Sequence, residues 1–347
     1  MKILFLTYGN ETVASSRTRV FQYLPYLKSQ NHSTSILIYE NNSFFSPTLY
    51  RYGIFLAFLL LIPFYEVVFI QKVLFGLPVI RFLKLWIKIF RKIVVFDFDD
   101  AIFTTPKNVK IREQQLSLGV RFRNTVRLSD LVVLENAFNK SNVENLVENI
   151  LVITGPIDTN RYHPRVSESR RDVVIGWIGS PSTTMYLEPL IPILFQLQRK
   201  YPHISFKTIG ASPITFPGLR IKQVPWNLQT EVPELHEFDI GVMPLTDDEW
   251  SQGKGGYKIL QYMALGIPAI ASPVGVNSEL IVDGHSGFLP LTIEDWRDKL
   301  DLLGSSEKFR MELGKFGRQL AIEKYSFEVS SPRLFNAISK LLHSPLE

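Results

Sequence analysis

Residues 253–287 read GKGGYKILQYMALGIPAIASPVGVNSELIVDGHSG, and this stretch says most about the fold. Three glycines, Gly253, Gly255 and Gly256, precede an apolar, helix-length run that ends at another glycine, the usual helix terminator. The run IPAIAS then predicts a buried strand, which is followed by a second glycine turn at Gly275. Helices that alternate with buried strands in this way predict an α/β protein with a parallel sheet.

The same alternation extends over the rest of the chain, on both sides of a polar, charged segment at residues 161–172. Strands are predicted at residues 2–9, 33–40, 65–72, 92–101, 129–136 and 149–155, and then at 172–180, 204–212, 219–226, 238–245 and 267–275. The total of 347 residues suits two domains of about 150 residues each. We therefore expect two Rossmann-like domains that face a cleft, with ligands beyond the carboxyl ends of the strands.

Composition narrows the possible chemistry. Hydrophobic residues make up 46% of the chain, which is a globular composition, and there is no cysteine. The sequence therefore excludes thiol nucleophiles, disulfides and Cys-ligated metals. Residues 1–165 carry 20 Lys/Arg against 12 Asp/Glu, whereas residues 166–347 carry 18 against 21. The first half should attract an anionic partner, but no nucleic-acid-binding module is recognisable, so we expect no nucleic acid.

Two segments bear on membranes. The apolar stretch at residues 53–70 contains Pro63 and Glu66 and divides into a helix-like run at residues 54–64 and a strand-like run, EVVFI. The helix-like part is too short to span a bilayer, so it predicts a buried core helix. The helix predicted at residues 80–92 has a basic face of Arg81, Lys84, Lys88, Arg91 and Lys92, and an apolar face of Phe82, Leu83, Trp86, Ile87 and Phe90. Such a helix covers a sheet with a solvated basic face, or it docks on anionic lipid.

The glycine-rich start of the helix after Gly256 is a candidate anion site. Lys254 lies among the glycines, and Lys258 lies near the first turn of the helix. Free backbone N–H groups and ammonium groups together attract an anion such as a diphosphate. A glycine turn with two solvated lysines is the alternative, but the second turn, at Gly275, favours a ligand site.

These residues resemble the nucleotide-sugar signature of GT-B glycosyltransferases, specifically glycosyltransferase family 4. The segments that match are Gln261-Tyr262-Met263-Ala264-Leu265-Gly266-Ile267-Pro268 and Glu279-Leu280-Ile281-Val282-Asp283-Gly284-His285-Ser286-Gly287. Thr154-Gly155-Pro156-Ile157-Asp158, Arg161-Tyr162-His163-Pro164 and Lys324-Tyr325-Ser326-Phe327 resemble further phrases of that family.

The resemblance implies a domain plan and a donor site. Residues 1–165 would form the acceptor-side domain, 166–325 the nucleotide-sugar domain, and 326–347 a helix that crosses back to the first domain. The donor would bind at Gly179, Ser180, Lys254, Gly255, Gly256, Tyr257, Lys258, Gln261, Val274, Gly275 and Glu279. The family also implies retention of stereochemistry, a nucleotide diphosphate sugar as co-substrate, and no metal or other cofactor.

This sequence departs from the family at its paired glutamates. The family's ribose-binding glutamate is replaced by Gln261, and the glutamate that faces the donor sugar is replaced by Gly253. Glutamine still donates and accepts hydrogen bonds to hydroxyls. Asp247, Asp248 or Glu249 would be substitutes for the missing carboxylate. The family's cations after the first strand of this domain are also absent, and Lys254 and Lys258 are the candidates to replace them.

Three carboxylates, Asp97, Asp99 and Asp100, end the predicted strand at residues 92–101. Asp97-Phe98-Asp99 has the spacing of the nucleophile of haloacid dehalogenase phosphatases and of the metal site of GT-A glycosyltransferases. We prefer a third interpretation, in which Asp99 and Asp100 orient the acceptor on the wall of the N-terminal domain. The structural alternative is that they pair with Arg121 or Arg123.

The turn after the first strand contributes the remaining candidates. Gly9 permits close approach of a ligand to the backbone, and Arg17 and Arg19 are potential phosphate ligands. Because residues two apart on a helix do not share a face, we expect only one of the arginines to face the ligand.

Together, the residues and the resemblance predict a metal-independent hexosyltransferase-like glycosyltransferase, with Asp99, Asp100 and Lys258 as catalytic residues. Its acceptor would be a glycan, a polysaccharide or a lipid-linked molecule, as in cell-surface polysaccharide biosynthesis. A cytoplasmic location follows, with possible peripheral attachment to the membrane. Two alternatives remain open: an epimerase with the same fold and donor, and a nucleotide-sugar-binding protein without activity.

Overall fold

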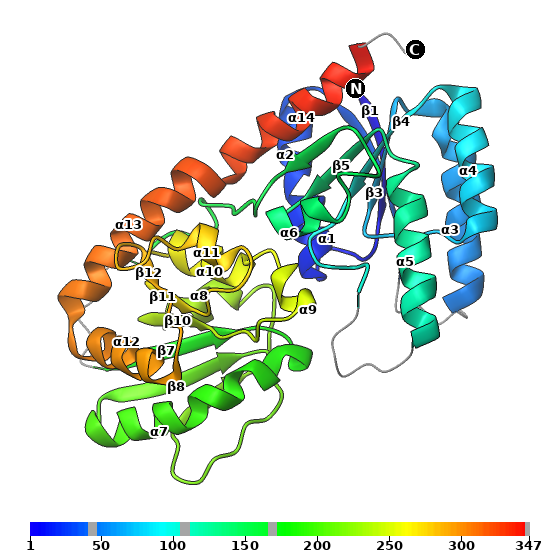
Figure 1. The fold of residues 1–347 in the computed structure, drawn as a ribbon. Helices are drawn as coiled ribbons and strands as arrows, with labels where there is room; N and C mark the ends of the chain where they lie inside the picture. The colour runs from blue at the N-terminus through cyan, green and yellow to red at the C-terminus, as the bar shows by residue number, and fades with distance from the viewer. Residues whose placement is uncertain (41–46, 105–111, 166–171, 344–347) are drawn as a thin grey trace. The chain divides into compact units, whose positions relative to one another are not determined.

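The computed structural model describes residues 1–40, 47–104, 112–165 and 172–343 (Figure 1). The chain divides into two compact units. Unit 1 comprises Met1–Pro156, Gln252–Gly255 and Phe327–Glu347, and unit 2 comprises Ile157–Ser251 and Gly256–Ser326. The first division falls at Pro156, before the expected boundary at residue 165. Gln252–Gly255, a piece of the glycine-rich stretch, is part of unit 1, although no sequence pattern indicates this.

Unit 1 contains a six-stranded parallel sheet in the order β2-β1-β3-β4-β5-β6. The strands are β1 (Lys2–Thr7), β2 (Ser33–Ile38), β3 (Val67–Gln71), β4 (Ile93–Asp97), β5 (Leu131–Leu134) and β6 (Ile150–Val152). The helices are α1 (Ala14–Arg19), α2 (Leu24–Ser29), α3 (Pro47–Leu61), α4 (Leu77–Phe90), α5 (Arg112–Val126), α6 (Ala137–Ser141) and α14 (Phe327–His343). Short 3-10 helices add η1 (Phe21–Tyr23) and η2 (Ile62–Phe64).

Alternate residues of these strands face two separate cores, because side chains alternate across a strand. One face, with Leu4, Val68 and Val94, packs against α3, α4 and α5. The other face, with Phe5 and Phe69, packs against η1, α2 and α14, which contributes Leu334, Phe335 and Ile338. Burial on both faces explains why the strands of unit 1 read as continuous apolar runs.

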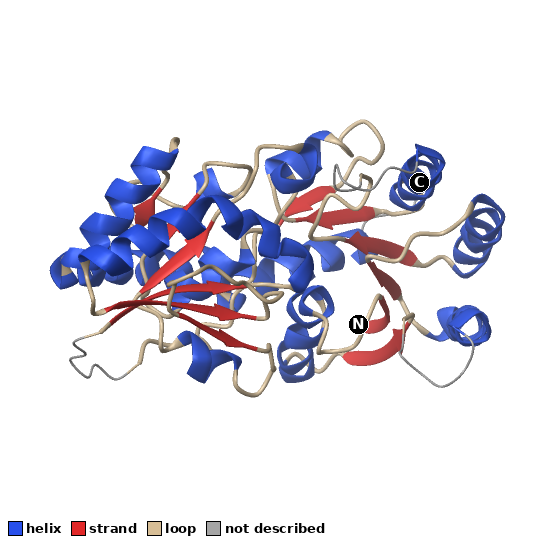
Figure 2. Cartoon of the chain, turned by 90° about the horizontal axis from the view of Figure 1, so that it is seen from below, coloured by secondary structure: helices blue, strands red, loops and turns tan. Residues whose placement is uncertain are grey.

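Unit 2 repeats this plan with a second six-stranded parallel sheet in the order β12-β11-β10-β7-β8-β9 (Figure 2). The strands are β7 (Val173–Ile178), β8 (Ile204–Ile209), β9 (Ile221–Val224), β10 (Ile240–Met243), β11 (Ala269–Ala271) and β12 (Gly287–Phe288). The helices are η3 (Pro181–Leu190), α7 (Ile191–Lys200), α8 (Glu231–Leu235), α9 (Glu249–Gln252), α10 (Tyr257–Ala264), α11 (Asn277–Leu280), α12 (Ile293–Ser305) and α13 (Glu307–Tyr325). The predicted α/β architecture with two parallel sheets is confirmed.

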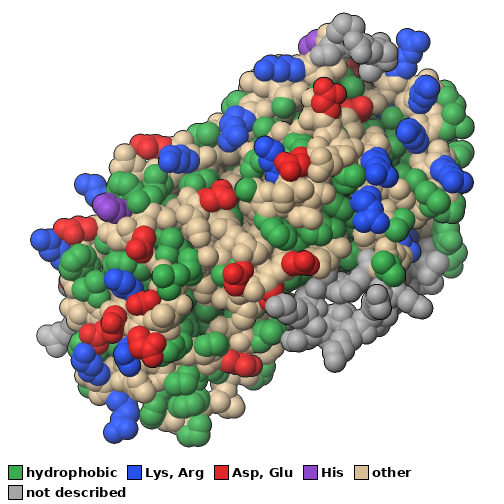
Figure 3. Space-filling view, viewed as in Figure 1, with side chains coloured by type: hydrophobic (Ala, Val, Ile, Leu, Met, Phe, Trp, Pro, Cys, Tyr) green, Lys and Arg blue, Asp and Glu red, His purple; other side chains and the backbone are tan. Residues whose placement is uncertain are grey.

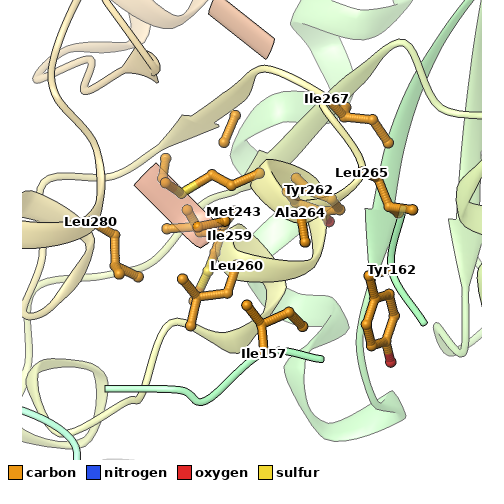
Figure 4. Close-up of a cluster of buried hydrophobic side chains, with 14 of the residues drawn as sticks. Ile157, Tyr162, Met243, Ile259, Leu260, Tyr262, Ala264, Leu265, Ile267 and Leu280 are labelled. Atoms are coloured by element: carbon orange, nitrogen blue, oxygen red, sulfur yellow. The ribbon is translucent and has the colours of Figure 1, made fainter. Parts of the chain in front are cut away.

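The helix α10 is the centre of one core of unit 2. Ile259 and Leu260 point into a cluster with Met243 and Leu280 (Figure 4), while Trp177 lies in the core on the other face of the sheet. Because the buried face of α10 anchors it against the strands, its first turn is held beside the strand ends.

The helices α3 and α4 differ from the sequence expectation. The run at residues 54–64 was expected to form a buried helix, yet Leu56 and Leu60 of α3 are exposed. Phe82 was assigned to the apolar face of α4, but it lies exposed among the cations, as do Leu85 and Ile89. The outer face of α4 therefore carries apolar residues as well as cations. No helix in the described part of the chain is long and apolar enough to cross a membrane.

Candidate active site

In unit 2, the turn after β7 lies against the first turn of α10. A Cβ atom on Gly179 would come within 2.3 Å of the Trp177 ring and 2.9 Å of Lys258 Nζ. The Lys258 ammonium lies 4.5 Å from the centre of the Trp177 ring, which is a cation–π contact. The structure therefore brings together Gly179 and Lys258, two predicted donor residues from distant parts of the sequence.

The two glycine turns of the signature also meet. Gly256 precedes α10 with a φ of 69°, a conformation that suits glycine. A Cβ atom there would lie 2.5 Å from Leu280 and 2.8 Å from Val276, which flank the turn at Gly275. The N-terminus of α10 thus packs on the turn after β11, which holds Val274 and Gly275. Exposed Glu279 of the same segment accepts a hydrogen bond at its carbonyl from Tyr325.

Gln261 lies in a polar cluster that the sequence did not reveal. Its side-chain Nε2 donates to Glu231 Oε1 at 2.5 Å, and the residue is 4% exposed. The Tyr162 hydroxyl donates to the same carboxylate oxygen, and Trp226 Nε1 donates to the other at 2.8 Å. Tyr257 stands edge-on to Tyr162, with ring centres 6.5 Å apart. The role of Gln261 at the ribose stays a prediction; its Nε2 is already bonded to Glu231.

The loop Gln252–Gly255 is bound to the rest of unit 1 by side chains at the start of α6 and within it. Asn136 Nδ2 donates to the carbonyl of Lys254 at 3.0 Å, and Asn139 Nδ2 donates to that of Gly253 at 3.0 Å. A Cβ atom on Gly255 would fall 1.2 Å from Glu135 Oε2, so a side chain there would have to displace this buried carboxylate. Of the two predicted donor lysines, Lys254 therefore belongs to unit 1 and Lys258 to unit 2.

Arg19 forms a buried ion cluster in unit 1 and does not face a ligand. It is fully buried, and it binds Asp97 through Nε at 2.9 Å and Nη2 at 2.7 Å, and Glu135 through Nη1 at 3.2 Å. Burial opposes its charge, but attraction by Asp97 and Glu135 outweighs it and raises the pKa of Arg19. The prediction that Arg19 and Asp97 contact a ligand is corrected, because both residues are fully buried and form an ion pair with each other.

Gly9 and Arg17 occupy the neighbouring turn. A Cβ atom on Gly9 would come within 2.5 Å of Val13, so packing alone accounts for this glycine. Arg17 Nη1 donates to the carbonyl of Glu11 at 3.1 Å and is partly exposed. A phosphate contact of Arg17 stays a prediction.

Asp99 and Asp100 lie around Lys72, a residue that sequence reasoning did not single out. Lys72 Nζ is 2.8 Å from Asp99 Oδ1 and 2.6 Å from Asp100 Oδ2. In the part of the chain that the structure describes, both aspartates thus pair with Lys72, which the structural alternative did not name. The available signal was a lysine directly after the apolar run EVVFIQ, at the carboxyl end of a predicted strand. No three metal-ligating side chains gather anywhere in the described ranges.

Unit 2 also has a cavity of about 380 Å³ that contains none of the predicted donor residues. Its lining includes Asp239 and Pro268, which directly precede β10 and β11, together with Arg165 and Arg310. The cavity therefore lies at the amino ends of these strands, whereas the glycine turns lie at their carboxyl ends. Because ligands of such sheets bind beyond the carboxyl ends of the strands, we place the donor site at the turns.

Residues 193–303, within unit 2, match the family described as "Glycosyl transferases group 1". The match covers one segment of the chain, and the chain as a whole shares the fold of solved GT-B glycosyltransferases. No curated protein matches it in sequence.

Solved structures similar over nearly the whole chain include HepE of Anabaena in complex with UDP, at 14% identity, TM-score 0.70, and coverage of 98% of this chain and 100% of that one. Sucrose-phosphate synthase from Thermosynechococcus elongatus is similar at 11% identity and TM-score 0.73, with 98% and 99% covered. A glycosyltransferase from Rickettsia africae is similar at 13% identity and TM-score 0.69, with 99% of each chain covered.

Proposed function

We propose that this protein transfers a sugar from a nucleotide diphosphate sugar to an acceptor hydroxyl, with retention and without a metal. One observation carries the proposal: Lys258 lies beside Gly179, and the N-terminus of its helix packs on the turn after β11. An ammonium and two glycine turns at the carboxyl ends of parallel strands suit a diphosphate. HepE has been solved with UDP and with UDP-glucose, so uridine diphosphate sugars are the first donors to test.

In this mechanism, unit 2 binds the donor and unit 1 supplies the acceptor side. Lys258 and the backbone N–H groups that precede α10 stabilise the negative charge that develops on the departing diphosphate. Because that charge is met by the protein's own cation, the reaction needs no metal ion. Asp100, the more exposed of the two aspartates at Lys72, orients the acceptor hydroxyl.

We further propose that unit 1 docks on anionic membrane through the outer face of α3, η2 and α4, so that the acceptor is lipid-linked and the protein acts at the cytoplasmic face of a membrane. The large apolar residues of this face are between 47% and 70% exposed. They are Leu56, Leu60, Phe64, Phe82, Leu85 and Ile89. Trp86 of α4 donates to the carbonyl of Leu59 of α3 at 2.9 Å, so the two helices are direct neighbours.

Cations accompany these apolar residues. Arg81, Lys84 and Lys88 of α4 are exposed, and residues 67–96 contain no Asp or Glu. Figure 3 shows Lys and Arg side chains among hydrophobic ones over the region where Figure 1 places α4. An interfacial helix has two components: apolar side chains that insert into the membrane, and neighbouring cations that attract lipid phosphates.

The function is tested by incubating the protein with nucleotide diphosphate sugars, with and without candidate acceptors, and by measuring nucleotide release and product. Release that requires an acceptor supports transfer. A changed sugar formed from donor alone indicates an epimerase, and donor binding without turnover over a broad acceptor panel indicates a binding protein.

A further inference from the structure

Lys72 has an unusual backbone conformation for its position. It follows β3 with a φ of 61°, and the only other non-glycine residues with positive φ in the described part of the chain are Asn31 and Arg91. A side chain disfavours this left-handed region, because its Cβ atom comes too close to the following carbonyl oxygen. Arg91 caps the end of α4, where this conformation is common, whereas Lys72 ends a buried strand. Backbone strain at a strand end that faces polar groups points to a functional constraint.

The conformation places the lysine amine among three acceptors from two other segments. Lys72 Nζ donates to Asp100 Oδ2 at 2.6 Å and to Ser15 Oγ at 2.9 Å, and lies 2.8 Å from Asp99 Oδ1. Ser15 Oγ in turn donates to Asp99 Oδ2. Asp99 Oδ2 is therefore hydrogen-bonded to Ser15, whereas Asp99 Oδ1 contacts the ammonium group as an ion pair without a hydrogen bond of good geometry.

Carboxylate groups outnumber cationic groups in and around this cluster. Asp97 and Glu135 lie close enough to interact with Asp99, while Arg19 offsets those two, and Tyr8 is near Lys72. Burial disfavours the charge of Lys72, but Asp100 and Asp99 attract it more strongly and raise its pKa. Two neighbouring carboxylates without a cation would repel each other, and one of them would take up a proton.

Exposure separates the two aspartates. The side chain of Asp100 is 31% exposed, whereas those of Asp99 and Lys72 are 16% and 19% exposed. Asp99 with Ser15 thus fixes the amine from the inside, and Asp100 is the member that a substrate reaches most easily.

We propose that Lys72 is a positioning residue for the transfer reaction, which holds Asp100 in one orientation and keeps it ionised toward the acceptor. The inference rests on the proposed function, in which Asp100 orients the acceptor hydroxyl. Asp99 and Ser15 act through Lys72, by fixing its amine. In this backbone conformation at the end of β3, the amine of Lys72 reaches both carboxylates.

The test compares Lys72→Met, Lys72→Arg and Lys72→Gly with a matched control, Asn31→Gly, which relaxes a left-handed residue outside the site. We expect Lys72→Met to lower kcat at least tenfold (an order-of-magnitude figure for one positioned charge) and to leave the donor Kd unchanged. The acidic limb of the kcat profile should move up by about one to three pH units, because the carboxylates lose their cation. Lys72→Arg should restore most of kcat and of the pH profile.

Lys72→Gly removes the amine and also relieves the backbone strain, since glycine adopts positive φ without strain. It therefore separates the effect of the amine from that of the strain. It should be as impaired as Lys72→Met, while Asn31→Gly should retain the wild-type kcat. Wild-type turnover in Lys72→Gly, or an unchanged pH profile in Lys72→Met, overturns the proposal.

A measurement without turnover keeps the inference separate from the proposed function. In protein labelled with ¹³C at the aspartate carboxyl carbons, the titration of Asp100 is followed by NMR and assigned with Asp100→Asn. We expect its midpoint to rise in Lys72→Met by about one to three pH units, and an unchanged midpoint contradicts a role for Lys72. If the wild-type protein neither binds nor turns over any donor, the proposed function fails, and this titration still decides the role of Lys72.

Discussion

The ammonium group of Lys258 lies 4.5 Å from the centre of the Trp177 ring, so a cation of helix α10 is held against the last part of strand β7. Trp177 is 1% exposed and fixed in the core, which gives the lysine a rigid support. The contact leaves the amine beside the turn at Gly179, where the account places the donor diphosphate.

Replacing Lys258 should weaken donor binding and slow transfer. A hydrogen bond from a charged group contributes about 1.5–3 kcal/mol, so Lys258→Ala should raise the Kd for the donor by roughly 10- to 150-fold. The matched control is Lys299→Ala, which removes a second lysine that lies over an aromatic ring, 4.7 Å from the centre of Phe288 in the same unit. Equal donor affinity in both variants would remove Lys258 from the site.

A methyl group at Gly179 should displace the lysine. The Cβ of Gly179→Ala would stand 2.9 Å from Lys258 Nζ and 2.3 Å from the Trp177 ring. Because Trp177 is buried and cannot move freely, we expect donor affinity to fall at least tenfold and the melting temperature to drop as well. Gly53→Ala adds its methyl to open space on α3 and should leave donor affinity unchanged. Wild-type affinity in Gly179→Ala would show that this turn is remote from the donor.

Asp100→Asn should abolish most transfer and leave donor affinity nearly intact, because the account assigns Asp100 to the acceptor side. Turnover is measured as nucleotide release with acceptor, and donor binding by calorimetry serves as the control for folding. A collapse of donor affinity, or activity that comes to depend on added magnesium or manganese, would speak for a donor-side or metal role instead.

The outer face of α3 and α4 should bind anionic vesicles. Each cation near such a surface contributes about 1 kcal/mol, so Lys84→Glu/Lys88→Glu should reduce co-sedimentation, and high salt should do the same. Leu85→Ser/Ile89→Ser should weaken the salt-resistant part, since these side chains are exposed beside the cations. Equal binding to neutral and anionic vesicles, or no effect of the charge reversal, would reduce α4 to a cover for the sheet.

The stability of the protein should depend on pH through Glu135. Burial raises the pKa of Glu135 well above its usual value of 4.5, against the attraction of Arg19. A folded-state pKa above the unfolded one means that the folded state binds more protons, so this contribution to stability is lost as pH rises above about 4.5.

The comparison that isolates this carboxyl is Glu135→Gln, which keeps an oxygen to accept from Arg19. The free energy of unfolding of the wild-type protein should fall between pH 5 and pH 8 relative to that of Glu135→Gln, by about 1.4 kcal/mol for each unit by which the pKa is raised. Asp97 is present in both proteins, so its contribution to the pH dependence cancels in the comparison. Parallel pH dependence of the two unfolding free energies would show that Glu135 is ionised in the fold.

The sheets could be predicted from the sequence because parallel strands are buried on both faces. Runs such as ILFL in β1 and IVVF in β4 read as continuous apolar segments, and the glycines at Gly256 and Gly275 mark the turns between elements. The short strand β12 was missed because two residues, Gly287 and Phe288, give no periodic signal.

The partners of the site residues could not be predicted, because they depend on which strands are neighbours. Lys72 reaches Asp99 and Asp100 only because β3 pairs with β4, and Arg19 reaches Asp97 and Glu135 across the same sheet. A local pattern therefore marked the aspartates as a group, but it could not show that Asp97 is buried by an ion pair while Asp100 remains accessible.

Two further features are non-local in the same sense. Asn136 and Asn139 bind the loop at Gly253, which belongs to unit 1 although the sequence around it forms unit 2. Glu231, which binds Gln261, follows no recognisable motif, since it lies in the short helix α8 far from the glycine-rich stretch. Only the folded arrangement identifies these residues.

The central claim is that Lys258 and the glycine turns of unit 2 bind the diphosphate of a nucleotide sugar. Its most direct test is a calorimetric titration of the wild-type protein and of Lys258→Ala with UMP, UDP and UDP-glucose. The account predicts that the wild-type protein binds UDP and UDP-glucose at least tenfold more tightly than UMP, and that Lys258→Ala loses most of this difference, because a charged hydrogen bond to the diphosphate is worth about 1.5–3 kcal/mol. Equal affinity of the wild-type protein for UMP and UDP, or no binding of any of the three and of the corresponding nucleotides of other bases, would contradict it.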